Sequence, residues 1–165
     1  MQQAPVTART FRTRSGHTLH IAAQALVLLS RHRQLSAKVP EAGGVLLGRH
    51  LLESEEVVVD EVTEPQATDR RGRFSFFRSS RHDALARERW LATRETSGYL
   101  GLWHTHPEAV PTPSNVDKDD WRLALERDSF EGQHLHFIIV GTAALRVWVG
   151  RNGKPLQEAK EVVDG

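Results

Sequence analysis

The segment Trp103–Asp117 (WHTHPEAVPTPSNVD) constrains this chain more than any other stretch. Its polar residues follow a spacing of His104, one residue, His106, seven residues, Ser114, two residues and Asp117. Successive side chains of an extended strand point to opposite faces, so the two imidazoles are expected on the same face. An oxygen ligand from the following turn would fill a third corner of a tetrahedron. The fourth corner would be left for water, as in catalytic rather than structural zinc sites.

Chance rarely produces this spacing. In a chain of this composition, the pattern would arise by accident in roughly one case in a thousand. A second histidine pair, His134 and His136, provides a comparison within the chain, because the positions where serine and aspartate would follow hold Ala144 and Val147. We therefore predict a metal site at the first pair and not at the second.

An acidic residue lies far upstream, in the segment Pro40–Gly48 (PEAGGVLLG). Glu41 shortly precedes Gly43 and Gly44, and glycines permit another segment of backbone to approach closely beside a site. A carboxylate within hydrogen-bond reach of a metal-activated water can act as its general base. The sequence therefore offers a base as well as ligands.

Together, these residues resemble the JAMM (JAB1/MPN/Mov34) metalloprotease family, in which a glutamate before a glycine-rich strand precedes the His-x-His, Ser and Asp signature. The resemblance covers most of the chain, from about Phe11 to Arg151. It looks closer to the small bacterial JAB proteins that are encoded beside ubiquitin-activating-like and conjugating-like enzymes in CBASS antiphage operons. The segments that carry this narrower resemblance are Pro40–Gly44, Thr68–Arg71, Trp103–Glu108, Pro111–Ser114 and Asp117–Trp121. Leu102 departs from the subgroup, which is expected to have an acidic residue there; this bears on a substrate contact and not on the metal ligands.

The resemblance implies a role for five residues. His104, His106 and Asp117 would hold one catalytic zinc ion, Glu41 would be the general base, and Ser114 would help to hold the oxyanion. Ser114 is also a preferred helix N-cap residue, and the two roles can coexist.

Three other acids compete for a place in the site. Asp119 and Asp120 are rival ligands, but the Ser-x-x-Asp spacing selects Asp117, and Asp120 is expected to face solvent. Glu108 follows Pro107 in a loop and is expected to contact solvent or substrate.

The resemblance also implies the fold and the activity. It implies one α/β JAB1/MPN domain over residues 1–165, with a mixed sheet flanked by helices in a cytidine-deaminase-like, three-layer arrangement. The expected activity is that of a zinc-dependent isopeptidase that removes a ubiquitin-like or C-terminally conjugated protein from its target. In the CBASS interpretation, that protein is the operon's nucleotidyltransferase, and the operon's activating and conjugating enzymes are further partners.

Three alternatives remain open. The first is a JAB peptidase that trims a small ubiquitin-like sulfur carrier or a siderophore-pathway protein. The second is a non-catalytic MPN scaffold, which would require lost ligands. The third is a DNA-linked role like that of RadC-like JAB proteins.

The composition restricts the classes of function. Basic and acidic residues nearly cancel, 22 against 21, so neither a nucleic acid nor a membrane is expected as a partner. The absence of cysteine excludes disulfides, a thiolate nucleophile and the cysteine-liganded zinc deaminases. No signal peptide is visible, and the apolar run Ile21–Leu29 is too short to span a bilayer, so a cytoplasmic protein is predicted.

Periodicity and turn residues predict the order of the elements. The expected strands are Thr10–Arg12, Thr18–Ile21, Gly43–Leu52, Val57–Val59, Tyr99–His106, Leu135–Val140 and Leu145–Val149. The expected helices are Ala22–Arg33, Arg81–Glu95, with Leu85, Trp90 and Leu91 towards the core, and Ser114–Asp128. A polar tail is expected from Gly150 onward.

The stretch Thr63–Ser80 is predicted as a long, arginine-rich loop, and loops of this length are often functional. Solvated arginines paired with local acids are its simplest interpretation, ahead of a nucleic-acid site. The resemblance favours a third one, in which arginines and interleaved phenylalanines form a wall for an extended peptide tail. The residues in question are Arg70, Arg71, Arg73, Arg78, Arg81, Phe74, Phe76 and Phe77.

Overall fold

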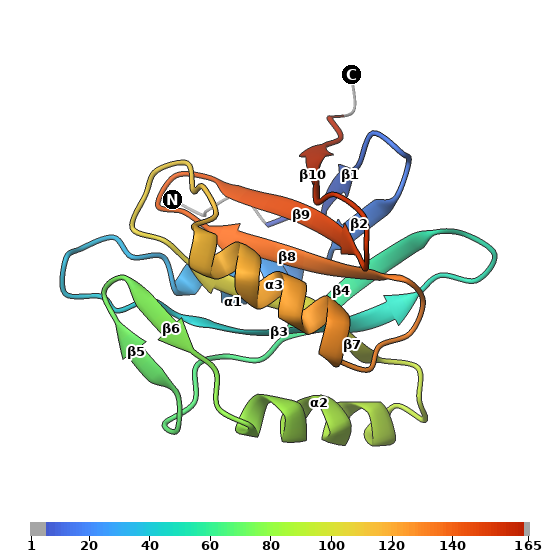
Figure 1. The fold of residues 1–165 in the computed structure, drawn as a ribbon, viewed down its shortest axis with the longest axis horizontal. Coiled ribbons are helices and arrows are strands. Elements are labelled where there is room, and N and C mark those ends of the chain that lie inside the picture. The colour runs from blue at the N-terminus through green and yellow to red at the C-terminus, as the bar shows by residue number, and fades with distance from the viewer. Residues whose placement is uncertain (1–5, 164–165) are drawn as a thin grey trace.

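The computed structural model describes residues 6–163, which form ten strands and three helices (Figure 1). The strands are β1 (Arg9–Arg12), β2 (Thr18–Ile21), β3 (Gly43–His50), β4 (Glu56–Val62), β5 (Arg70–Gly72), β6 (Ser75–Phe77), β7 (Gly98–Thr105), β8 (His134–Val140), β9 (Leu145–Arg151) and β10 (Gln157–Glu161). The helices are α1 (Ala23–Arg31), α2 (Arg81–Ala92) and α3 (Asn115–Arg127). None of the three is long and apolar enough to cross a membrane.

One mixed sheet forms the body of the molecule. Eight strands close into a barrel in the order β1-β10-β9-β8-β7-β3-β4-β2. The pairs β2 with β4 and β7 with β8 are parallel, and the other neighbours are antiparallel. The predicted mixed sheet with flanking helices is confirmed, and closure of the sheet is an additional feature.

The helices cover the sheet on both faces. Along β3, Leu46 belongs to one buried cluster, whereas Val45 and Leu47 belong to the other, because alternate side chains of a strand face opposite sides. Leu29 of α1 packs in the first cluster and Trp121 of α3 in the second. Figure 1 shows α3 crossing β8 and β9. The result is the predicted layering of helix, sheet and helix.

The stretch predicted as a loop between Thr63 and Ser80 contains a short hairpin. Its strands β5 and β6 pair in the register Arg70 with Phe77. Three-residue strands are too short to show alternation in the sequence. In addition, β5 receives support from a distant segment, since the backbone N–H of Glu41 donates to the carbonyl of Gly72 at 2.8 Å.

The prediction of a polar tail from Gly150 onward is wrong for the residues of β10. This strand pairs with β9 on one side and β1 on the other, and thereby closes the barrel. Only Ala159 among its side chains is buried. Backbone hydrogen bonds therefore place this strand, and apolar alternation gives no signal for it.

The prediction that α2 turns Leu91 to the core is also wrong. Leu91 is 59% exposed, Leu85 and Trp90 are partly buried, and the buried residue of the helix is His82. The side chain that α2 buries is therefore the polar His82, and the spacing of hydrophobic residues does not predict this.

Candidate active site

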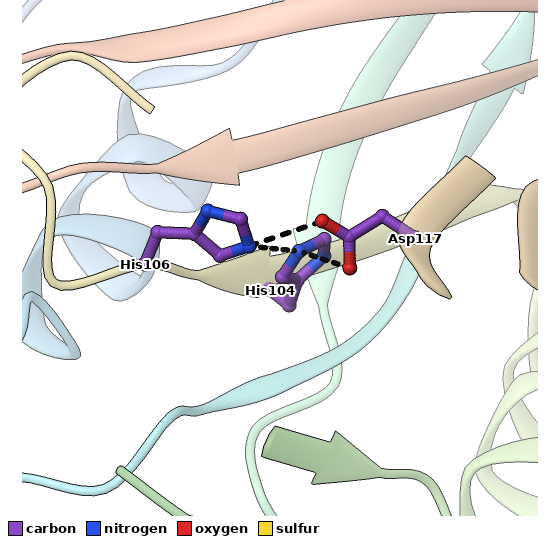
Figure 2. A group of neighbouring side chains, drawn as sticks. All are labelled: His104, His106 and Asp117. Carbon is purple, nitrogen blue, oxygen red and sulfur yellow. Dashed lines mark hydrogen bonds and ion pairs between the residues drawn. The ribbon is translucent and has the colours of Figure 1, made fainter. Parts of the chain in front are cut away.

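Two adjacent elements bring the predicted ligands together. His104 lies near the end of β7, His106 follows just beyond the strand, and Asp117 lies in the first turn of α3. Figure 2 shows the three side chains pointing toward one another. The Nε2 atoms of the histidines are 3.1 Å apart, and each is 3.1 Å from one carboxylate oxygen of Asp117. The sequence pattern therefore corresponds to a real cluster.

This cluster has the donor set of a metal site. It offers two imidazole nitrogens and one carboxylate oxygen, all within 4.8 Å of one another. Within residues 6–163, no other group of three potential metal-binding side chains converges in this way. Two nitrogens and one oxygen make three protein ligands, the number typical of a catalytic rather than a structural zinc site.

Glu108 orients one of the two imidazoles. Its carboxylate Oε1 lies 2.7 Å from Nδ1 of His106, so this nitrogen carries the proton and Nε2 faces the cluster. Metal-binding histidines usually have such a partner on the second nitrogen. The Glu108 side chain is 48% exposed, as expected of a solvent contact, and its bond to His106 is an additional contact that was not predicted.

The charges of the cluster favour ionised side chains. Burial opposes protonation of His106, but hydrogen bonds to Asp117 and Glu108 outweigh this effect and raise the pKa of His106 to about 9. Burial likewise opposes ionisation of Asp117, but its bonds to His104 and His106 hold the pKa of this carboxyl below its usual range. A bound cation would replace these protons as the partner of the carboxylate.

Ser114 fixes the position of Asp117 through a capping box. The Ser114 hydroxyl accepts a hydrogen bond from the backbone N–H of Asp117 at 3.1 Å, and Asp117 Oδ2 accepts one from the backbone N–H of Ser114 at 2.8 Å. The predicted N-cap is confirmed. A hydroxyl that accepts one bond still has its own proton to donate, so the cap is compatible with a role toward substrate.

The register of two strands places Glu41 beside the histidines. β3 pairs with β7 so that Gly43 lies opposite His104. Two residues earlier, Glu41 comes within reach of His106, with 3.9 Å between its Oε1 and the Nε2 of the imidazole. Burial is the main reason that the pKa of Glu41 is raised to about 7, and His106 partly offsets it. A carboxyl with this pKa can both take up and release a proton near neutral pH.

The β5–β6 hairpin holds the backbone of Glu41 from both sides. Gly72 accepts from its N–H, and Nε of Arg71 donates to its carbonyl at 2.8 Å. Gly43 is required beside this contact, because a Cβ there would lie 2.6 Å from the ring of Phe76. Arg71 was predicted as one of several arginines that are solvated or line a wall for a tail, and no sequence signal indicates its contact with Glu41.

A buried glutamine connects the hairpin to the metal cluster. Gln34 is 3% exposed; its Nε2 donates to the carbonyl of Arg73 at 2.8 Å, and its Oε1 accepts from the Thr105 hydroxyl at 2.9 Å. Thr105 lies between the two histidines and in turn accepts from the N–H of Ala42 at 2.9 Å. Gln34 lies in an ordinary polar segment after α1, and nothing in its local sequence indicates these contacts.

A second buried network closes the base of the hairpin segment. His82 Nε2 lies 2.8 Å from the Asp69 carboxylate, and its Nδ1 lies 2.6 Å from the Thr63 hydroxyl. Asp69 also accepts from the N–H of Ser79, and Thr63 accepts from the N–H of Val45. These hydrogen bonds connect Thr63 and Ser79, which lie before and after the hairpin in the sequence, and Thr63 connects them to β3.

The rival residues lie elsewhere. Asp120 pairs with Arg78 at 3.1 Å, so it does not simply face solvent as expected, and Asp119 is exposed. Leu102 is 2% exposed and packs in the core, so it offers no surface to a substrate. In the second histidine pair, His136 Nε2 faces His17 rather than a third ligand.

Comparison with known proteins identifies the family. The family model described as prokaryotic homologs of the JAB domain matches residues 23–150. The chain belongs to this family. This JAB domain is 37% identical over 131 residues to a "CD-NTase/cGAS isopeptidase" of Pseudomonas aeruginosa, covering 78% of the chain and 80% of that protein. It is 31% identical over 147 residues to a protein of the same name from Vibrio cholerae, covering 88% and 89%.

A solved structure agrees on the fold of the JAB domain. A Desulfitobacterium hafniense protein solved in solution superposes with a TM-score of 0.61 at 21% identity, covering 85% of this chain and 88% of that one. The predicted resemblance to the JAMM family is confirmed by the family match, and the relatives support its narrower form.

Proposed function

We propose that this JAB domain is a zinc-dependent isopeptidase that releases a C-terminally conjugated protein, a CD-NTase-type nucleotidyltransferase, from its target. The names of the relatives support this reaction class and substrate. The observation that carries the proposal is the convergence of His104, His106 and Asp117, with the Glu41 carboxylate beside them.

Zinc is the metal that the donor set fits best. Two imidazole nitrogens and one carboxylate oxygen from His104, His106 and Asp117 would hold it. Bound in such a site, zinc supplies Lewis-acid chemistry that acidifies water and polarises a carbonyl.

The protein's own residues carry the proton transfers. Glu41 takes a proton from the attacking water on its carboxylate and then delivers it to the amine nitrogen of the departing lysine side chain. Its pKa of about 7 suits both steps. The Ser114 hydroxyl donates to the oxyanion that forms when water adds to the scissile carbonyl.

The hairpin beside Glu41 is suited to guide the conjugated tail. Phe74 is 72% exposed and Phe77 is 52% exposed, and the guanidinium groups of Arg73 and Arg70 lie over their rings at 4.9 Å and 5.5 Å. An extended tail would find apolar surface, cations and a strand edge there.

The observations favour this function over the alternatives. A scaffold without activity would lack a ligand or the base, and here all four side chains lie together. Trimming of a sulfur carrier or siderophore-pathway protein would use the same chemistry, but the relatives carry the isopeptidase name.

A direct assay tests the proposal. The substrate is the nucleotidyltransferase joined through its C-terminal carboxylate to a lysine of a reporter protein, and the products are separated by gel and by mass spectrometry. We expect release of the intact nucleotidyltransferase, loss of release after chelation, and recovery on addition of zinc. Release that is unaffected by chelation, or no release by the zinc-loaded protein, would contradict the proposal.

A further inference from the structure

A groove runs along the side of α3, between this helix and the β9–β10 hairpin. It has a volume of about 720 Å³. Its floor is apolar, and the groove extends to Thr112 and Pro113, which precede Ser114 in the sequence. The apolar side chains that line it are Trp121, Leu125, Trp148 and Leu156.

The rim of this groove is cationic. The charged side chains that line it are Lys118, Arg122, Arg146, Arg151, Lys154, Glu126 and Glu158. The two acids are already engaged, Glu126 by Arg122 at 3.2 Å and Glu158 by Arg146 at 2.8 Å. The remaining three cations, Lys118, Arg151 and Lys154, are exposed and form no ion pair within residues 6–163. The groove therefore has an excess of positive charge around an apolar floor.

The groove and the metal cluster share a wall. Trp121 stacks on Phe137 with ring centroids 4.7 Å apart, and its ring centroid lies 6.3 Å from that of His104. Lys118 directly follows the predicted ligand Asp117 on α3. The groove therefore runs along the same helix that carries the predicted ligand Asp117.

The loop that leads into α3 also contacts the groove. Arg146, which lies over the ring of Trp148 at 4.8 Å, donates from Nη1 to the carbonyl of Pro111 at 2.8 Å. The other side of α3 carries Asp120, which pairs with Arg78 after the hairpin. The groove is thus separate from the hairpin surface that would guide the tail.

We infer that this groove binds an acidic segment of the conjugated protein that carries at least one large apolar side chain. The cations complement Asp and Glu residues, and the half-buried Leu125 and Leu156 offer the accessible apolar contact for the anchor. A single-stranded nucleic acid fits less well, because Trp121 and Trp148 are 2% and 5% exposed and present no open ring face for stacking. This inference rests on the proposed function, and it adds a second contact that recognises the substrate beyond its tail.

Peptide binding tests the groove without cleavage. The probe is a fluorescein-labelled peptide in which a Leu-Phe pair lies between runs of Asp and Glu, measured by anisotropy with the zinc-loaded, full-length protein. Reversing two charges, Arg151→Glu with Lys154→Glu, is expected to raise the Kd about tenfold. The matched control, Lys38→Glu with Arg87→Glu, makes the same change in net charge at exposed residues outside the groove and should leave the Kd within about twofold.

The floor needs its own variant and probe. Leu156→Ala should weaken binding of the peptide, and a probe with Ser in place of Leu and Phe should bind weakly to every variant. Thermal unfolding of each variant shows that it is folded. Equal Kd values for the groove and control variants, or an oligothymidylate that competes for the groove more tightly than the peptide, would overturn the inference.

Kinetics separates this inference from the proposed function. With an isopeptide substrate that bears only a short tail, the Arg151→Glu, Lys154→Glu variant should retain its kcat/KM. With a conjugate that includes the acidic segment, its KM should rise about tenfold. Chelator-sensitive cleavage with identical KM values in all variants would overturn the groove alone, whereas absence of cleavage in the unmodified protein would overturn the function.

Discussion

Nε of Arg71 donates a hydrogen bond to the backbone carbonyl of Glu41 at 2.8 Å. On the opposite side of the same peptide segment, the N–H of Glu41 donates to the carbonyl of Gly72 at 2.8 Å. The main chain of the proposed general base is thus held by two consecutive residues of a hairpin that begins 29 positions later along the chain. The hairpin therefore supports the proposed base, in addition to offering the proposed surface for the tail.

Replacing Arg71 should impair the chemical step. We expect Arg71→Ala to lower kcat about tenfold, with a smaller change in KM, because a charge-assisted hydrogen bond that positions the base contributes about 1.5–3 kcal/mol. Metal content should stay unchanged. Arg70→Ala is the control, since Arg70 lies on the same strand but contacts the ring of Phe77. Equal effects of both changes on kcat would show that Arg71 does not position Glu41 and contributes only to the exposed surface of the hairpin.

Replacing Glu41 should separate metal binding from catalysis. Glu41→Gln keeps the shape of the side chain but cannot accept a proton, so we expect kcat to fall by about 10²–10⁴ while zinc remains stoichiometric by elemental analysis. Full activity of this variant would remove Glu41 from the mechanism. Loss of zinc would instead make it a ligand.

The contact between Glu108 and His106 should tune the affinity for metal. Glu108→Ala removes the acceptor of the Nδ1 proton, and loss of such a partner typically weakens metal binding by about 10–100-fold. Competition with a zinc-binding dye measures this affinity. His104→Ala, which removes a proposed ligand, should bind far more weakly still, and Glu126→Ala should match the unmodified protein. An unchanged affinity in His104→Ala would discard the assigned ligand set.

The buried pair of His17 and His136 should make stability depend on pH. Their Nε2 atoms are 2.7 Å apart, and Nδ1 of His136 donates to the carbonyl of Leu100. Burial, aided by His134 and His50, lowers the pKa of His17 to about 4. Burial, aided by His17, lowers the pKa of His136 to about 3. Both side chains therefore stay neutral at a pH where the unfolded chain takes up protons.

The sign of the effect follows from this difference. Below about pH 6.5, the unfolded state binds more protons, so the free energy of unfolding falls by about 1.4 kcal/mol per pH unit for each histidine until its folded-state pKa is reached. His136→Gln removes one of the two groups, so its unfolding free energy in urea should fall less steeply with decreasing pH. Parallel curves for the variant and the unmodified protein would exclude the pair as the cause.

The spacing of residues in the sequence was sufficient to predict those parts of the site that lie within one strand and the helix start that follows it. Alternation along a strand puts His104 and His106 on one face, and the helix signal at Ser114 places Asp117 in a first turn. These are local properties of the backbone, and the spacing of the residues reports them directly. The family resemblance added Glu41, which no local rule connects to the histidines.

Tertiary structure alone decided the contacts between distant segments. The pairing of β3 with β7 brings Glu41 beside His106, and the hairpin contact through Arg71 then holds its backbone. Gln34 and β10 were not predicted for the same reason. The buried amide of Gln34 is satisfied by residues far away in the sequence, and the polar strand β10 is held by the backbone groups of its neighbours. Neither feature produces a periodic pattern in the sequence. The stability of both depends on which segments the fold makes adjacent, and not on the order of residues within a segment.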